Sequence, residues 1–346
     1  MNKRQSGHAS VGRSNFKRCA VATLILAVAG MTGSTWTGLA WAQTNVKRVG
    51  ILSLFGRSDD ATWDRLWMQP LHRKLAAQGW AEGKNVVFEY RTAQGDPSQF
   101  SKAAKELVDL GVDVIMAESA PATRAAFTAT RTIPIVAIDL TTDPISEGYI
   151  ESYGQPGGNL TGVFLDAPEF AGKWFELLNE IIPHLSRVAV LWDPAPGSAH
   201  LRAVRSVAGS LNVKVQVLEV RKAADFGAAF SAITEGTQAV IILPSPTTYW
   251  QNPRLAELGL KHRLPATSMA LEFAAAGGAI AYGPDRRTFV DRLAVLVAKI
   301  LEGTKPAELP VERPTKVQLI VNLKTTKKLG IHVPQSILLR ADEVIE

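Results

Sequence analysis

The chain has 346 residues, of which 46% are hydrophobic and 20% are charged. A chain of this length is too long for a single small hydrophobic core, so we expect two domains of about 120 to 170 residues each. The net charge of +6 is concentrated at the N-terminus, because residues 1–42 contain five basic residues and no acidic one. The rest is nearly neutral, which excludes the broad basic surface that nucleic-acid binding requires.

Residues 1–42 have the organisation of a secretory signal peptide. A basic region ends at Lys17–Arg18, an apolar stretch runs from Cys19 to Met31, and Ala40-Trp41-Ala42 offers a small-x-small cleavage site. The apolar stretch is too short for a dedicated transmembrane helix, although an uncleaved anchor is the alternative. We therefore expect a periplasmic protein, cleaved near Ala42, whose mature chain has no cysteine.

After the signal peptide, the hydrophobic pattern alternates between strands and helices. Strands are predicted at 46–54, 85–90, 112–116 and 133–138, and helices at 60–78, 98–110 and 121–130. Pro70 falls inside the first helix and should kink it or shift its boundary. This alternation predicts right-handed crossovers and a parallel sheet covered on both faces.

The same alternation recurs in the second half of the chain. Strands are predicted at 187–192, 213–219, 238–243, 264–268, 278–282 and 316–321, and helices at 198–211, 224–235, 252–263, 286–301 and 324–329. The halves correspond unit by unit, so the predicted fold class is α/β, with two similar lobes joined by a multi-strand hinge. Lobe 1 is expected to comprise 43–162 plus about 284–313. Lobe 2 is expected to comprise 163–283 plus about 314–346.

Candidate binding residues lie where the predicted strands end, because ligand loops follow the carboxyl ends of parallel strands. The candidates are Ser53, Glu118, Ser119, Asp139, Thr141, Asp143, Asp193, Ser198, Ser245, Glu272 and Tyr282. Helix N-termini next to them suit a carboxylate, and the acidic side chains suit an ammonium, so an amino acid fits the mixture. For any single aspartate, a helix cap or an Asx turn is the alternative role.

Several aromatic side chains near these loops are candidates for stacking on an apolar or aromatic part of a ligand. They are Trp63, Tyr149, Tyr153, Trp192, Tyr249, Trp250 and Tyr282. Packing in the core or at an interface is the alternative for each of them.

Enzyme signatures are absent from the sequence. There is no G-x-S-x-G elbow, no phosphate-binding G-x-x-x-x-G-K-[ST] loop and no G-x-G-x-x-G after the first strand. The six histidines show no zinc-binding spacing. We therefore expect no catalytic residues, no metal and no cofactor.

Several longer motifs together resemble the ABC transporter substrate-binding protein family, of the type I periplasmic binding fold, in the group related to tryptophan- and tyrosine-binding proteins. They include IPIVAIDLTTDP at 133–144, QPGGNLTGV at 155–163, EFAAAGGAIAYG at 272–283 and RADEVIE at 340–346. The resemblance implies capture of a small solute, such as an amino acid or an aromatic acid, by closure of a cleft. It also implies delivery to an ABC permease at the membrane, and we expect the receptor to be a monomer.

The chain departs from the family pattern at Glu118, where a small, glycine-rich loop is usual, and at Leu271, where an arginine is usual. A carboxylate at position 118 favours a cationic or hydroxyl-rich group of the solute. Two other functions remain open: a binding ectodomain that serves a signalling system, and a secreted enzyme. A sugar-responsive repressor shares the fold, but the export signal and the lack of an N-terminal helix-turn-helix argue against it.

Overall fold

A computed structural model describes residues 46–54, 61–165 and 168–346, so the predicted signal peptide lies outside the described residues. The first sheet has the strand order β2-β1-β3-β4-β5, and all of its neighbouring strands are parallel. Its strands are β1 (Lys47–Ser53), β2 (Val86–Thr92), β3 (Val114–Glu118), β4 (Ile135–Asp139) and β5 (Leu160–Phe164).

The second sheet has the order β12-β11-β10-β9-β8-β6-β7. Its strands are β6 (Arg187–Trp192), β7 (Lys214–Glu219), β8 (Ala239–Ile242), β9 (Ala266–Ser268), β10 (Ile280–Pro284), β11 (Val317–Asn322) and β12 (Glu343–Ile345). Neighbouring strands are parallel except β10 and β11, which are antiparallel. The first five strands of each half follow the same spatial order, so the duplication predicted from the sequence is confirmed.

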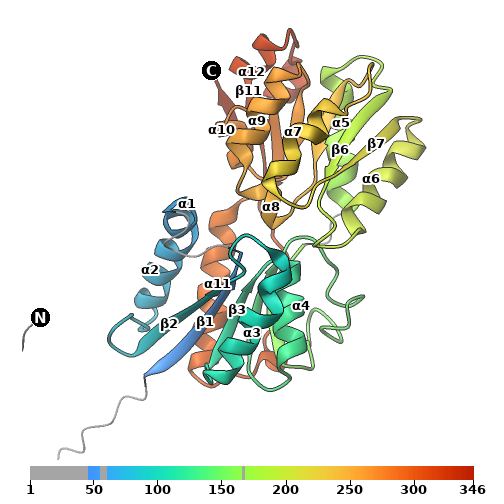
Figure 1. Cartoon of the computed structure of the whole chain (residues 1–346). Coiled ribbons are helices and arrows are strands. Elements are labelled where there is room, and N and C mark those ends of the chain that lie inside the picture. Colours follow the sequence, from blue (N-terminus) through green and yellow to red (C-terminus); the bar gives the residue numbers. More distant parts are fainter. Residues whose placement is uncertain (1–45, 55–60, 166–167) are drawn as a thin grey trace, which may run out of the picture. The chain divides into compact units, whose positions relative to one another are not determined.

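Helices cover both faces of both sheets (Figure 1). Those of the first half are α1 (Ala61–Trp63), α2 (Gln69–Ala77), α3 (Phe100–Asp109) and α4 (Ala120–Ala129). Those of the second half are α5 (Pro168–Ile181), α6 (Ala199–Ser210), α7 (Phe226–Ser231), α8 (Pro246–Tyr249), α9 (Asn252–Lys261) and α10 (Glu272–Ala275). The chain continues with α11 (Arg286–Leu301), α12 (Leu323–Lys328) and α13 (Gln335–Leu338).

The central strands of the first sheet are largely apolar because helices cover both faces of the sheet. Val136 and Ile138 of β4 pack against α2 and α11, whereas Ile135 and Ala137 pack against α3 and α4. Successive side chains of a strand point to opposite faces, and here both faces are covered. The predicted α/β organisation with helix-flanked parallel sheets is therefore confirmed.

Helix α11 belongs to the core of the first sheet although β10 and β11, which it connects, belong to the second. Its ribbon lies beside the first sheet (Figure 1), and Phe289, Val290 and Leu293 belong to the same apolar cluster as residues of β1, β3 and β4. Thr161 of β5 donates a hydrogen bond to the carbonyl of Leu309 at 2.9 Å, so the connection after α11 also lies beside the first sheet. The chain thus passes between the sheets after β5, at the start of α11 and before β11. The exact lobe limits stay a prediction.

Pro70 does not end the helix: the helical segment continues from Ala61 to Ala77, and only the type of helix changes near Pro70. It lies at the start of α2, directly after a π-helical turn, Asp64–Met68. Proline has no N–H to donate to the carbonyl four residues earlier, which is that of Leu66. The Leu66 oxygen instead accepts a hydrogen bond from Nη1 of Arg286, 220 residues further along the chain.

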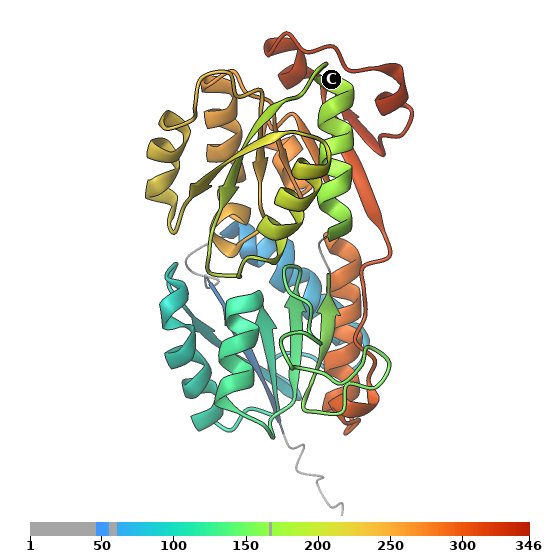
Figure 2. The same cartoon turned by 90° about the vertical axis from the view of Figure 1, so that its right-hand side faces the viewer.

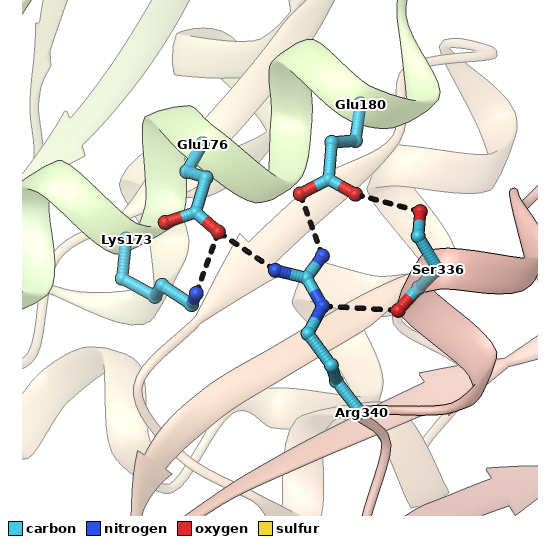
Figure 3. A network of polar contacts seen from close by, with 5 residues as sticks. All are labelled: Lys173, Glu176, Glu180, Ser336 and Arg340. Atoms are coloured by element: carbon cyan, nitrogen blue, oxygen red, sulfur yellow. Dashed lines mark hydrogen bonds and ion pairs between the residues drawn. The ribbon is translucent and has the colours of Figure 1, made fainter.

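The C-terminal segment is attached to α5 by a group of charged side chains (Figure 2, segment in red). Arg340 donates to Glu176 at 2.7 Å and to Glu180 at 2.6 Å, and Ser336 also donates to Glu180 (Figure 3). Lys173 contacts Glu176 at 2.6 Å. The arrangement holds α13 and the residues before β12 against α5.

Candidate functional site

A cavity of about 120 Å³ lies where the carboxyl ends of strands from both sheets meet. Residues that follow β1, β3 and β4 of the first sheet line it, together with residues that follow β8 and β9 of the second. The turn before α2 and the first residues of α11 complete the wall. Ligand sites of α/β proteins occur in such crevices outside the carboxyl ends of the strands.

Most of the cavity wall is apolar and aromatic. Trp67, Tyr249, Trp250 and Phe289 line it, along with leucine, methionine and proline side chains. The rings of Trp67 and Tyr249 meet edge to face at 6.4 Å between centroids, and those of Tyr249 and Trp250 at 4.9 Å. These contacts hold the rings in fixed orientations, so the wall is preformed for a flat apolar group.

Several polar side chains on the wall are engaged within the protein. The hydroxyl of Thr141 donates to Asp139 at 2.8 Å, and that of Ser245 accepts from the backbone N–H of Thr248 at 3.0 Å. The hydroxyl of Ser268 likewise accepts from a backbone N–H. These groups shape the loops, and the bonds they make leave less of their capacity for a ligand.

Arg286 joins three segments on the wall. Its Nε donates to Glu272 of α10 at 2.9 Å, its Nη1 donates to the carbonyl of Leu66, and its guanidinium lies 5.6 Å from the ring centroid of Trp67. The Arg286 side chain is 17% exposed and that of Glu272 is 31% exposed. Both charges therefore neutralise each other at the cavity wall.

Glu118 and Ser119, like the indole nitrogen of Trp67, differ from these polar groups of the wall because each has a buried polar atom without a hydrogen-bond partner. Glu118 Oε2 accepts a hydrogen bond from Nε1 of Trp63 at 2.8 Å, whereas its Oε1 is buried without a hydrogen-bond partner. The hydroxyl of Ser119 is also buried without a partner. Burial raises the pKa of Glu118 from 4.5 to about 8, against a smaller lowering effect of the Trp63 bond.

Ser119 has an unusual backbone conformation, with φ of 107°. Its N–H donates to the carbonyl of Ile138 on β4, and its own carbonyl accepts from Thr123 of α4, both at 2.8 Å. Positive φ is costly for a residue with a Cβ and persists only where the surroundings impose it. The neighbouring strand and helix therefore fix the position of the Glu118–Ser119 pair.

Five of the residues predicted from the sequence line the cavity, namely Glu118, Ser119, Thr141, Ser245 and Glu272. Tyr249 and Trp250, which were candidates for stacking, line it too. The structure brings these residues together from loops that are more than 150 positions apart in the sequence. Whether they contact a ligand stays a prediction.

Two of the predicted acidic residues are engaged in their own turns. Asp139 is fully buried and accepts four hydrogen bonds from the backbone and hydroxyl groups of Thr141 and Thr142, and burial raises its pKa. Asp143 accepts from Ser146 and from the backbone N–H of Ile145. Burial acts to raise the pKa of Asp143, but these bonds outweigh it and lower the pKa. Both carboxylates shape loops beside the cavity.

The other predicted residues lie away from the cavity wall. Ser53 is fully buried at the end of β1, and the hydroxyl of Ser198 accepts from Arg202. The ring of Tyr282 packs against Phe170 at 5.7 Å between centroids. Asp193 accepts from the backbone N–H of Ala195 and lines a separate cavity of about 520 Å³. The assignment of these four residues to a binding site also stays a prediction.

Trp67, Arg286 and Phe289 are among the wall residues that sequence analysis did not find. Trp67 and Phe289 follow helical periodicity, which does not distinguish a core position from a cavity wall. The position of Pro70 indicates that the carbonyl of Leu66 needs another donor, but it does not identify that donor as Arg286. Among the described residues, no group of three or more histidine, cysteine, aspartate or glutamate side chains is arranged to hold a metal ion.

Two parallel sheets of the same strand order, with a cavity at their carboxyl ends, define a type I periplasmic binding fold. The chain belongs to the ABC transporter substrate binding protein family, whose model matches residues 65–345. Members of this family are solute-binding proteins, not enzymes, and they work with ABC transporter permeases. The family resemblance stated from the sequence motifs is confirmed.

Three relatives illustrate the similarity. A tyrosine-binding protein of Clostridioides difficile is 23% identical over 264 residues, which cover 75% of each chain. The crystal structure of a conserved domain protein from Vibrio cholerae O1 biovar El Tor is 28% identical, with a TM-score of 0.78, over 86% of this chain and 99% of that one. The ABC domain from Streptococcus pneumoniae in complex with L-Trp is 22% identical, with a TM-score of 0.77, over 87% of this chain and all of that one.

The described part of the chain contains no helix with the length and apolar character needed to cross a membrane.

Proposed function

We propose that the protein is an exported receptor of an ABC importer that captures a small aromatic solute, such as an amino acid or an aromatic acid, in the cavity between its two sheets. The solute is then delivered to a membrane permease. The observation that carries this proposal is the cavity itself, which both sheets build and aromatic side chains line. We expect the receptor to act as a monomer without a cofactor.

The size of the cavity suits one ring. An apolar cavity of roughly 150 Å³ is enough to bind benzene in a protein interior. The cavity of about 120 Å³ is close to that size, and closure or opening of the loops around it would adjust the fit. Burying about 120 Å² of apolar ring surface contributes on the order of 3 kcal/mol.

Closure needs no chemistry, only a higher affinity of the solute for the closed state than for the open one. A preference of about 100-fold corresponds to roughly 2.7 kcal/mol. Because both sheets contribute to the wall, a solute in the cavity contacts both at once and supplies this difference. The three passages of the chain between the sheets, after β5, before α11 and before β11, provide the hinge.

A thermal-shift and calorimetric screen of residues 43–346 against amino acids, aromatic acids and sugars tests the proposal. Trp67 and Trp250 line the cavity, so quenching of intrinsic fluorescence gives a second readout. At 100 times its Kd, a solute should stabilise the fold by roughly 2.7 kcal/mol. Turnover of a compound without any stabilising solute would overturn the receptor function.

A matched pair of variants localises the site. Ala270 lines the cavity, and Ala275 is exposed on α10. Ala270→Leu should fill the cavity and abolish the shift caused by the solute, at a cost of about 1–3 kcal/mol to the apo protein. Ala275→Leu should keep the shift. Equal binding by both variants would place the solute elsewhere.

Export has a separate test. Protein recovered from the periplasm should begin at Gln43, as N-terminal sequencing or intact mass would show. Recovery of only the uncleaved chain would contradict cleavage near Ala42.

A further inference from the structure

Three polar side-chain atoms of the described cavity wall are buried without a hydrogen-bond partner; one is the indole Nε1 of Trp67, and the other two belong to Glu118 and Ser119. Thr141, Ser245 and Ser268 are bonded within their own loops, and Glu272 is paired with Arg286. Glu118 Oε1 and Ser119 Oγ, by contrast, are buried and have no hydrogen-bond partner. Both residues line the cavity and are adjacent in the chain. A solute without a polar group at this position would leave both atoms unpaired, and their burial would stay unfavourable.

The charges on the wall restrict what the solute can place there. On the described wall the one cationic side chain is Arg286, and Glu272, Leu66 and Trp67 already engage it. A carboxylate of the solute set against Glu118 would therefore face a carboxyl group without a cation to compensate. A cationic nitrogen would meet the open oxygen of Glu118, and the aromatic rings of the wall also favour a cation.

We propose that the solute is an aromatic compound with a protonated amine, and that this amine binds Glu118 Oε1 and Ser119 Oγ while the ring lies among Trp67, Tyr249 and Trp250. This inference rests on the proposed function and names the chemical class of its solute. Glu118 is the specificity-determining residue, because it lines the cavity, its Oε2 is held by Trp63 and its Oε1 has no hydrogen-bond partner within the protein.

Binding of the amine is coupled to release of a proton. Burial raises the pKa of Glu118 to about 8, so the carboxyl group is protonated in the empty cavity at pH 6. The ammonium group keeps its own proton, since a primary amine has a pKa near 10. When the ammonium binds, the Glu118 carboxyl loses its proton to solvent and an ammonium–carboxylate pair forms. Apparent affinity then rises about tenfold per pH unit below pH 8 and levels off above it.

The other titratable groups around Glu118 have distinct partners. On the cavity wall, Glu272 and Arg286 form an ion pair. Burial, with the nearby charge of Glu272, raises the pKa of Tyr249 well above 10.0, so Tyr249 stays neutral. On the neighbouring strand β4, the oxygens of Asp139 are held by Thr141 and Thr142, and burial raises the pKa of Asp139. A variant at position 118 removes the titration of Glu118 alone, so it distinguishes Glu118 from these other groups.

Isothermal titration with three matched probes tests the inference: 2-phenylethylamine, 2-phenylethanol and 3-phenylpropanoate. They share a ring and differ in presenting a cation, a neutral hydroxyl or an anion. We expect the amine to bind at least tenfold more tightly than the other two at pH 8. We also expect its affinity to rise about 50-fold between pH 6 and pH 8, with nearly one proton released at pH 6, as measured in buffers of different ionisation enthalpy.

Glu118→Gln keeps the size of the side chain and an oxygen for the Trp63 bond but cannot take a charge. It should lower the affinity for the amine and flatten the pH profile, while leaving the affinity for 2-phenylethanol within about threefold. Glu257→Gln, on the exposed surface of α9, serves as the control and should keep the wild-type profile. Unchanged melting cooperativity of Glu118→Gln confirms that the variant is folded.

Four outcomes would overturn the inference. Equal or tighter binding of the anion or the neutral probe would show that the cavity does not select a cation. A pH profile of Glu118→Gln equal to that of the wild type would assign the proton to another group. Binding of aromatic acids or sugars with a flat pH profile would refute the inference and leave the receptor function intact, whereas no binding of any compound would refute both.

Discussion

The raised pKa of Glu118 predicts that this residue destabilises the empty protein at neutral pH. The pKa rises from 4.5 to about 8, mainly through burial, so the folded state holds the proton more tightly than the unfolded chain does. The contribution of Glu118 to stability is then fully present below pH 4.5, declines as pH rises and is lost by about pH 8. Glutamine has the same shape without the charge and avoids this loss.

The magnitude follows from the two pKa values. Between pH 5 and pH 8, a group with this shift loses about 3.5 kcal/mol of folding free energy, at 1.36 kcal/mol per pKa unit. Glu118→Gln should therefore match the wild type within about 1 kcal/mol at pH 5 and exceed it by about 4 kcal/mol at pH 8. This gain is a large fraction of a typical unfolding free energy of about 5–15 kcal/mol.

Urea unfolding of the empty protein at pH 5, 6, 7 and 8, followed by circular dichroism, measures this difference. Glu235→Gln is the matched control, because Glu235 is exposed and its substitution should shift stability by less than about 0.5 kcal/mol at every pH. A constant difference between Glu118→Gln and the wild type across this range would refute the reasoning. It would mean that water or a rearranged side chain solvates the carboxylate.

Three further predictions concern other parts of the fold. Arg286→Met should lower the free energy of unfolding by about 2 kcal/mol and weaken solute binding at least tenfold, because it removes the bonds between three segments of the wall. The control is Arg287→Met, which should cost less than about 1 kcal/mol in urea unfolding because the Arg287 side chain is 72% exposed. Gly162→Ala should cost more than about 4 kcal/mol or prevent soluble expression, since its Cβ would lie 2.0 Å from a carbonyl oxygen of the neighbouring strand and its φ is +148°. Gly209→Ala, in a helix with open space around it, should instead stabilise the protein by about 0.5–1 kcal/mol. Arg340→Ala should lower stability by about 1 kcal/mol in low salt and by clearly less in 1 M NaCl, because Arg340 and its partners are partly exposed; a salt-independent loss would indicate that packing dominates.

Glu118 also illustrates how the proposed binding site would be maintained at a cost to stability. A buried carboxyl group with one open oxygen, next to a serine with positive φ, is unfavourable in the empty protein. Perturbed pKa values and backbone strain of this kind concentrate at functional sites. In the proposed function, the solute supplies the missing polar partner and relieves part of this cost.

The sequence predicted the architecture well because the signals for it are local. Alternating apolar runs and amphipathic segments located the strands and helices, with β6 and α11 predicted to the residue. The correspondence between the two halves predicted the repeated strand order. Pro70 indicated a local change within the first helix, because the missing N–H of proline acts within four residues.

The sequence by itself determined that polar loops follow the strands and that Glu118, Thr141 and Glu272 lie on such loops. Only the tertiary structure decided which of these side chains reach the cavity. The oxygens of Asp139 and Asp143 are satisfied by donors two or three residues away, so they turn towards their own loops. The position of an acidic residue directly after a strand in the sequence does not show whether its side chain turns towards its own loop or towards the cavity.

The same limit explains why the sequence did not predict the contacts of Arg286 or the unpaired oxygen of Glu118. The donor to Glu118 is Trp63, 55 positions earlier in the chain, and the acceptors of Arg286 come from α10 and from the turn before α2. Hydrogen bonds and apolar contacts between distant segments form only when the sheets bring them together, and local residue patterns carry no record of such pairs. The sequence thus determined the fold, and the tertiary structure decided which polar atoms of the cavity wall have no partner within the protein.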